Sequence, residues 1–209
     1  MYGIHDFGLY VGTCILLNLT PGQDTFYILG RSMAQGRSAG MASVLGISSG
    51  ALVHSLAAAL GLSAVVAASA TAFTVIKFAG AAYLIWLGIR MLLSPKQDNS
   101  LVSNAPPASS FGKVYRQGLL TNVLNPKVAL FFLAFVPQFI AKDSGNPFAA
   151  FILLGLTFVT TGTIWCFFLA LFAASLGRHL RERPGFGTWL NRTAGALLVL
   201  LGLRLATSK

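Results

Sequence analysis

Six long apolar stretches dominate this sequence. Each is long enough to cross the hydrocarbon core of a bilayer, which is about 30 Å thick and needs about 20 helical residues. They cover residues 5–29, 40–68, 72–91, 119–140, 148–176 and 189–206. Because the bilayer core offers the backbone no water, segments of this length must be helical to cross it. The sequence therefore predicts an all-α integral membrane protein with six transmembrane helices.

The composition supports a membrane protein and excludes several other classes. Charged residues make up 10% of the chain and the mean hydropathy is +0.72, whereas a soluble protein carries about 25% charged residues. Cys14 and Cys166 lie inside apolar stretches, so we expect small buried side chains there and no disulfide or metal site. Residues 1–6 hold no Lys or Arg, which favours a retained first span over a cleavable signal peptide.

The basic residues are distributed unevenly between the predicted connections. The first, third and fifth connections and their flanks hold Arg31, Arg37, Arg90, Lys96, Lys113, Arg116, Arg178, Arg181, Arg183 and Arg192, whereas the other connections and the tails hold Lys142, Arg204 and Lys209. Positive charge is retained on the cytoplasmic side, so both termini are predicted to lie outside. The net charge of +10 is thus explained by topology, without a nucleic-acid partner.

The longest connection, residues 94–112, divides the chain into two halves. It is rich in Ser, Asn and Pro and has too little apolar content to bury a core, so we interpret it as a cytoplasmic linker. Residues 1–93 and 113–209 then contain three spans each. Because three is odd, the second half must enter the membrane upside down relative to the first, which predicts two inverted three-helix repeats in a single domain.

The first span is interrupted by a polar run at residues 18–24 (NLTPGQD). Thr20 is a predicted N-cap and Pro21 suits the first position of a helix, where no backbone N–H is needed. Gln23 is placed to complete a capping box. We therefore expect one helix to end and another to begin inside the membrane.

The fourth span carries a similar interruption at residues 122–127 (NVLNPK). Asn125 is the predicted N-cap, Pro126 the first helical residue, and Lys127 follows directly. Both breaks occur in the first span of a half, and paired breaks of this kind are typical of the midplane site of a transporter. The alternative is a pair of proline kinks supported by neighbouring helices.

Four ionisable residues within the spans are candidates for function, because a charge at this depth costs about 3 kcal/mol. Lys127 lies too far along its span to reach either surface easily. Asp24 is either a site residue or a stabiliser of the helix start that it follows. Lys77 lies near the end of the third span, where a surface anchor is the alternative. His54 is either a proton relay or a histidine bonded to a neighbouring helix.

Other functional classes are less well supported by the residues. An intramembrane enzyme needs a nucleophile and base or paired acids, and Asp24 is the one carboxylate that we expect to be buried, so neither an enzyme nor a cofactor is predicted. Three His and two Cys are too few for a soft-metal path, although an ion exporter or a channel stays open. A membrane assembly subunit, joined through Asp24 and Lys127, is a further alternative.

Three ordered blocks resemble the lysine-exporter (LysE/RhtB) family of bacterial amino-acid exporters, and the resemblance covers nearly the whole chain. The blocks are LTPGQDTFYILGRSMAQGRSAGMASVLGISSGALVH at residues 19–54, KFAGAAYLIWLGIRML at 77–92 and LLTNVLNPKVALFFLAFVPQF at 119–139. The family commonly has Pro-Gly-Pro where this chain has Pro21, Gly22 and Gln23. The resemblance implies an inner-membrane exporter of amino acids or close derivatives, driven by the proton-motive force and working as a homo-oligomer.

These observations lead to one mechanistic hypothesis. A zwitterionic substrate lies between the two breaks, with its ammonium facing Asp24 and its carboxylate facing Lys127 and the half-helix N-termini. In the empty site, Asp24 either pairs with Lys127 or takes up a proton. The uncharged residues expected around the substrate are Asn18, Thr20, Pro21, Gly22, Gln23, Asn122, Asn125 and Pro126.

Overall fold

The computed structural model describes residues 2–62, 109–141 and 144–182, together with scattered residues between 74 and 93 and between 192 and 206. Most of the predicted third and sixth spans, residues 72–91 and 189–206, therefore lies outside the described residues. So do Lys77 and most of the predicted linker.

The first predicted span is broken in the structure. Helix α1 (Phe7–Leu19) ends at Thr20, and helix α2 (Gln23–Ala57) begins after Gly22. The break is confirmed, but the predicted capping is wrong. The Thr20 hydroxyl donates to the carbonyl of Leu16 at 2.8 Å and so closes α1, while Gly22 is the residue from which α2 starts.

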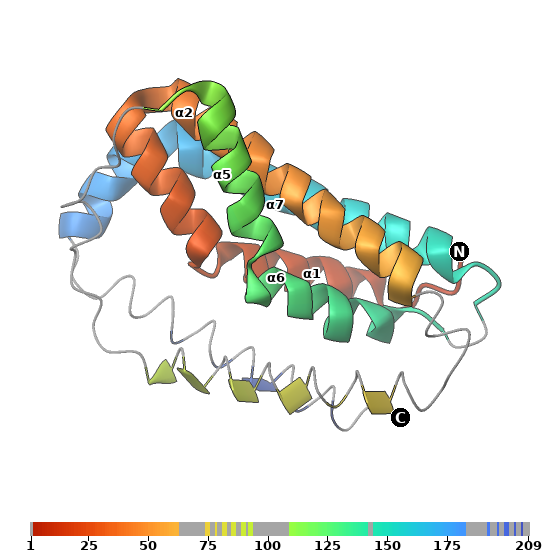
Figure 1. Cartoon of the computed structure of the whole chain (residues 1–209). Coiled ribbons are helices and arrows are strands. Elements are labelled where there is room, and N and C mark those ends of the chain that lie inside the picture. Colours follow the sequence, from red (N-terminus) through yellow and green to blue (C-terminus); the bar gives the residue numbers. More distant parts are fainter. Residues whose placement is uncertain are drawn as a thin grey trace.

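Helix α2 contains the end of the first predicted span and most of the second. At Gly36 the backbone leaves the helical region, with φ 79° and ψ −172°, and the helix changes direction there (Figure 1). A positive φ is readily adopted by glycine. Gly36 therefore divides α2 into two arms, residues 23–35 and 37–57, and the second arm continues into a π-helical turn, η1 (Ala58–Leu62).

The fourth predicted span is also broken. Helix α5 (Phe111–Val123) is followed by α6 (Pro126–Leu130), by a π-helical turn η3 (Phe131–Phe135) and by a 3-10 turn η4 (Val136–Phe139). The axis bends by 46° between α5 and the segment Pro126–Phe139. Asn125 caps α6 as predicted, since its side chain accepts from the Lys127 backbone N–H at 3.0 Å.

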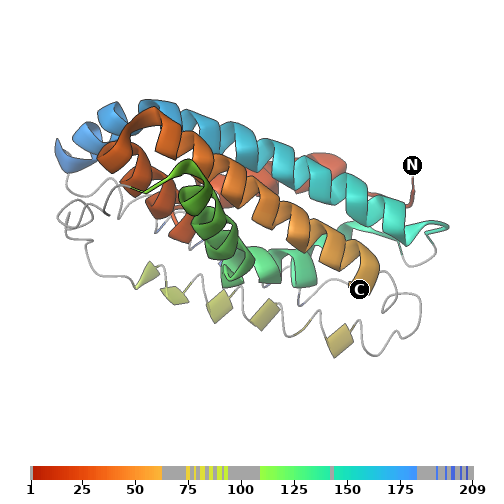
Figure 2. The ribbon, with the colours of Figure 1, turned by 45° about the horizontal axis from the view of Figure 1, so that its top comes forward.

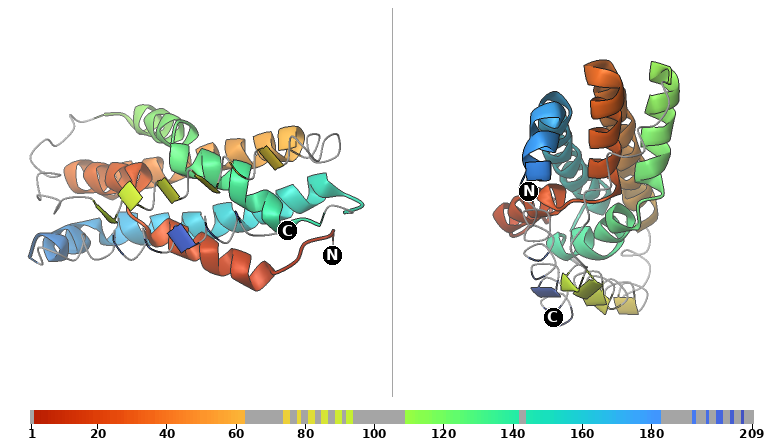
Figure 3. Two further views of the ribbon diagram at one scale, coloured as in Figure 1. Left: turned by 90° about the horizontal axis from the view of Figure 1, so that it is seen from below. Right: turned by 90° about the vertical axis from the view of Figure 1, so that its left-hand side faces the viewer.

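Helix α7 (Pro147–Glu182) is the fifth predicted span. Its apolar part, Pro147–Ala173, and the α2 segment Gln23–Gly61 are each long and apolar enough to cross a membrane, and the bent pair α5 and α6 forms one further candidate. Seen end-on in Figure 3, α7, α2 and α5 lie side by side in one layer, with α1 and α6 beneath them. Helix α7 runs along the second arm of α2 (Figure 2).

The two broken spans run in opposite directions. At one end, the segment before α1 pairs with the segment after η4, where His5 N–H donates to the Phe139 carbonyl at 3.1 Å and Ala141 N–H to the Gly3 carbonyl at 2.8 Å. At the other end, Ser109 N–H donates to the side chain of Gln35 at 2.9 Å. The start of each broken span therefore lies beside the end of the other.

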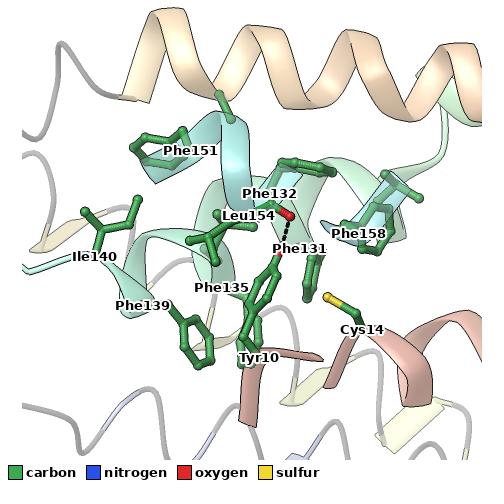
Figure 4. Packing of buried hydrophobic residues seen from close by; sticks show 14 of the residues in the cluster. Tyr10, Cys14, Phe131, Phe132, Phe135, Phe139, Ile140, Phe151, Leu154 and Phe158 are labelled. Atoms are coloured by element: carbon green, nitrogen blue, oxygen red, sulfur yellow. Dashed lines mark hydrogen bonds between the residues drawn. The ribbon is translucent and has the colours of Figure 1, made fainter. Parts of the chain in front are cut away.

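Aromatic side chains fill the space between α1, α7 and the segment after α6 (Figure 4). Phe131 stacks on Phe158 of α7 with ring centroids 4.9 Å apart, and the Tyr10 hydroxyl of α1 donates to the Leu154 carbonyl of α7 at 2.8 Å. Further members are Phe132, Phe135, Phe139 and Phe151. This packing fixes the irregular segment η3 against two regular helices.

Glycines let the second arm of α2 pack closely on α5. A Cβ at Gly50 would lie 2.7 Å from the Cβ of Asn122, and one at Gly46 would collide with the backbone at Tyr115. On the facing helix, a Cβ at Gly118 would lie 3.0 Å from the Ser43 carbonyl. The spacing of Gly46 and Gly50 is the small-residue pattern that brings membrane helices together.

Substitution of Gly46 by Ala is expected to destabilise the protein by about 1–3 kcal/mol, because the added methyl group meets backbone that cannot move aside cheaply. The matched control is Gly30→Ala, since no described atom lies within 4 Å of a Cβ at Gly30. The measurement is the thermal unfolding temperature of both variants in detergent. Equal unfolding temperatures for the two variants would contradict the proposed helix packing.

Candidate functional site

Asp24 connects the two breaks. It lies in the first turn of α2, and its Oδ2 accepts hydrogen bonds from Nδ2 of Asn122 at 2.9 Å and from Nδ2 of Asn125 at 3.1 Å. Both asparagines are buried, with 2% and 3% of their surface exposed. They belong to the end of α5 and to the cap of α6, so the carboxylate of the first break is held by the second break.

Lys127 makes the reciprocal connection from the second break to the first. Its Nζ donates to the carbonyl of Leu17 at 2.7 Å and to that of Thr20 at 2.9 Å. These carbonyls belong to the last turn and the end of α1, where a helix carries partial negative charge, and the Leu17 carbonyl also accepts from the Thr20 N–H at 3.2 Å. The ammonium group therefore caps the broken end of α1.

Asp24 and Lys127, which are both described, do not form an ion pair with each other. Each is hydrogen-bonded to other groups, although they lie close enough to interact electrostatically. The direct pairing considered for the empty site is thus absent from this structure. Instead, each charged group binds polar groups of the opposite break: Asp24 binds Asn122 and Asn125, and Lys127 binds the carbonyls of Leu17 and Thr20. We call this set of residues the crossing.

Two buried oxygens at this crossing have no hydrogen-bond partner among the described residues. They are Oδ1 of Asp24 and Oδ1 of Asn122, and they belong to side chains that are already joined through their other polar atoms. A buried acceptor without a donor is unfavourable. Oδ1 of Asn122 lies against α2 at Gly50, so Oδ1 of Asp24 is the acceptor that suits one further donor, such as an ammonium group, a water or a proton.

The other candidate residues of the first break lie at different distances from these contacts. Asn18 donates to the Thr161 hydroxyl of α7 at 3.2 Å, and a Cβ at Gly22 would lie 3.8 Å from the Lys127 Nζ, so both positions belong to the crossing. Gln23 is exposed. Thr20 contributes its backbone carbonyl, because its hydroxyl is used within α1.

His54 lies beside the site without contacting Asp24 directly. Its Nε2 is 3.1 Å from the backbone carbonyl of Asn122, and its ring stacks on Phe132 with centroids 6.1 Å apart. This arrangement matches the alternative of a histidine bonded to a neighbouring helix. By holding the carbonyl of Asn122, His54 supports the end of α5 at the point where its asparagine meets Asp24.

Two residues of α7 join this site without having been predicted as site residues. Thr161 binds Asn18, and Cys166 lies near both Asp24 and Lys127. The available signal was a short polar run, TTGT at residues 160–163, in an otherwise apolar span. Thr163 also pairs with the Ser48 hydroxyl at 2.7 Å, so this run faces the second arm of α2.

Arg31 requires a correction. It was counted among the charges of the first connection, but it lies within α2 and is 7% exposed. Its guanidinium donates to the Gln117 side chain of α5 at 2.6 Å and lies 5.8 Å from the Tyr27 ring centroid. The sequence placed this residue in a connection because an apolar run was expected to end where a charge appears.

Among the described residues, no three His, Cys, Asp or Glu side chains gather as a metal site.

Comparisons with known proteins find relatives over nearly the whole chain. The leucine efflux protein of Klebsiella pneumoniae is 29% identical, over 99% of this chain and 97% of its own length. The homoserine/homoserine lactone efflux protein of Salmonella typhimurium is 29% identical, over 96% and 95%. An uncharacterized membrane protein of Vibrio cholerae is 33% identical, over 99% and 98%. No solved structure matches the chain significantly.

The profile of the LysE type translocator matches residues 15–209, which confirms the resemblance noted in the sequence. A match to this family and to efflux proteins also confirms a transporter and not an enzyme. Because this match covers residues 15–209, well over half of the sequence, the chain belongs to the LysE type translocator family.

Proposed function

We propose that this protein is an amino-acid efflux transporter that binds its substrate where the two helix breaks cross. The family and the relatives named as leucine and homoserine efflux proteins support amino-acid export. The location of the site is supported by Asp24, whose carboxylate bridges the two breaks and has one oxygen without a hydrogen-bond partner among the described residues. An ionisable group at this depth is retained mainly for function.

The chemistry of the proposed ligand follows from that oxygen. Leucine, homoserine and homoserine lactone, which appear in the names of the relatives, all carry a primary ammonium group. A carboxylate is the natural acceptor for it, because a hydrogen bond between two charged groups is stronger than one between neutral groups. We therefore assign the substrate ammonium to Oδ1 of Asp24.

The surroundings of the proposed site come from both breaks. The neighbouring residues are Asn18, Thr20, Pro21, Gly22 and Gln23 from the first break, and Asn122, Asn125, Pro126 and Lys127 from the second. In this conformation Lys127 is committed to the end of α1. Its proposed role is to hold the two breaks together. The substrate group for which the site provides a dedicated acceptor, Asp24, is then the ammonium group.

The proposed architecture is six transmembrane helices in two inverted three-helix repeats, residues 1–93 and 113–209, with a linker between them. Two observations support it. Helices α1 and α5 both have 13 residues and both are followed directly by a break, and the two broken spans run antiparallel. Antiparallel broken helices are what inverted repeats produce at a transporter midplane.

The proposed location is the bacterial inner membrane, with both termini in the periplasm. The unequal distribution of Lys and Arg between the connections supports this orientation. A homo-oligomer within the lipid bilayer is part of the same proposal and rests on the family resemblance.

We also propose that export is coupled to protons through Asp24. The unused oxygen accepts either a proton or the substrate ammonium, and the two cations exclude each other there. Protonation on the outer face would then release the substrate, and deprotonation on the inner face would allow the next one to bind. Rocking of one repeat against the other would expose the site alternately.

Replacement of Asp24 by Asn is the direct test of the site. We expect efflux of radiolabelled amino acids from preloaded proteoliposomes to fall by about 10-fold or more, because the substrate loses one hydrogen bond to a charged group. The matched control is Asp6→Asn, because Asp6 precedes α1 and its side chain is 62% exposed. Wild-type rates in Asp24→Asn would exclude Asp24 from the transport site.

The coupling is tested with the wild-type protein in a pH gradient. Efflux is expected to be faster into an acidic external buffer than into a buffer at the internal pH, because entering protons compete for Asp24. A protonophore is expected to abolish the difference. Rates that do not respond to the gradient would indicate a channel or uniporter, and no flux of any amino acid through well-folded protein would favour an ion pathway or an assembly role.

A further inference from the structure

A row of polar side chains lies between the two half-helices on the inner side of the crossing, which is the cytoplasmic side in the proposed orientation. These half-helices are α5 and the first arm of α2, residues 23–35. The members of the row follow one another at intervals of about one helical turn, so they share one face of the arm. They are Asp24, Tyr27, Arg31 and Gln35.

Hydrogen bonds join this polar row to α5 below the site. The Tyr27 hydroxyl donates to the Val114 carbonyl at 2.7 Å, and the Arg31 guanidinium donates to the Gln117 side chain at 2.6 Å. Arg31 is buried in spite of its charge, and Oδ1 of Asp24 is buried above it. The two half-helices are therefore closed over Asp24 on the inner side in this structure.

The opposite face of the first arm packs in a different way. Its residues Ile28 and Leu29 belong to an apolar cluster with Val44 of the second arm and with Leu169 and Ala170 of α7. Separating the arm from α7 would expose this apolar surface to water, which is unfavourable. Separating the arm from α5 breaks hydrogen bonds that water can replace. The polar face is therefore the one that parts more easily.

The outer side of the crossing is closed by aromatic rings. Tyr10 of α1 and Phe139 of η4 are buried against each other with ring centroids 5.1 Å apart, and Phe131 lies 6.0 Å from the Tyr10 ring. Opening this side would expose large apolar surfaces to water. The inner half-helices therefore part more readily than the outer ones.

We infer that the substrate enters between the first arm of α2 and α5, and that Arg31 keeps this inner entrance closed by binding Gln117. The inference rests on the proposed function and adds the route to its site. Non-helical backbone flanks the arm at Gly22 and Gly36, so the arm can tilt away from α5 as one short helix. Water then hydrates the guanidinium group, and Asp24 is reached from the cytoplasm, where an exporter must load.

Cys166 serves as a reporter of the entrance, because it lies near Asp24 and Lys127. The chain has two cysteines, so Cys166 is the single thiol in a Cys14→Ala background. The probe is a methanethiosulfonate with a charged group, which does not cross the bilayer. It is applied to the inner face in inside-out vesicles and to the outer face in right-side-out vesicles. While the open form is the minor one, the labelling rate follows its population.

Two substitutions shift this population in opposite directions. Tyr27→Phe removes the hydroxyl that joins the arm to α5, and labelling from the inner face is expected to rise about fivefold, the loss of one neutral hydrogen bond. Gln117→Glu gives Arg31 a partner of opposite charge and is expected to slow labelling about fivefold or more. The matched control is Tyr115→Phe, whose hydroxyl donates to Ser49 of the second arm at 2.9 Å. Inner labelling is expected to be unchanged in this control.

Opposite shifts at the inner face, with no shift at the outer face, support the inference. It is overturned if Tyr27→Phe and Tyr115→Phe change inner labelling equally, if the changes occur at the outer face, or if Cys166 is never labelled from the inner face.

The labelling requires no transported substrate, so it is separate from the test of the proposed function. If labelling shifts as expected and no amino acid leaves proteoliposomes that contain the wild-type protein, the entrance stands and amino-acid export fails. If amino acids are exported and labelling does not respond to either substitution, export stands and the entrance is overturned.

Discussion

Two helix breaks that satisfy each other's polar groups are the constraint on which this structure depends. Inside a bilayer, an unpaired backbone group costs several kcal/mol, and neither water nor lipid tails can supply the missing partner. The end of α1 is tolerated because Lys127 of the second break reaches its carbonyls. The carboxylate of Asp24 is tolerated because Asn122 and Asn125 donate to it. Either break alone would leave buried groups unpaired, so the two breaks must lie at the same depth.

The packing on the two sides of this crossing differs in kind. On one side, the aromatic rings around Phe131 interlock α1, α7 and the segment after α6 (Figure 4). On the other side, the second arm of α2 meets α5 through Gly46, Gly50 and Gly118, where backbone atoms and the side chain of Asn122 lie directly against the glycines. Hydrogen bonds between His54 and the Asn122 carbonyl and between Tyr115 and Ser49 join the same two helices. This face between the second arm and α5 is therefore held by close backbone contact and by polar groups, whereas the aromatic side is held by interlocked rings.

The sequence indicated Asp24, Lys127 and the two asparagines that bind Asp24, but not the backbone partners of Lys127. Asp24 and Lys127 stood out because ionisable residues within apolar spans are rare and expensive. Their partners include two backbone carbonyls of α1, which carry no signal in a sequence and are found only once the breaks are placed together. Thr20 was expected to start α2, but its hydroxyl returns to α1 and Gly22 starts α2 instead. Arg31 was placed in a connection because a hydropathy profile reflects its charge but not its hydrogen bond to Gln117 of α5.

The division of labour within Asp24 suggests how a single carboxylate can serve both binding and coupling. One oxygen is filled by two amide donors and fixes the side chain between the breaks, so the other oxygen is presented without any movement of the backbone. In the proposed cycle that oxygen binds either a proton or the substrate ammonium. Both are cations, so one must leave the oxygen before the other can bind to it. Lys127 lies within electrostatic range and disfavours a second positive charge beside its own. Exchange then follows from occupancy of one atom, and no separate coupling site is required.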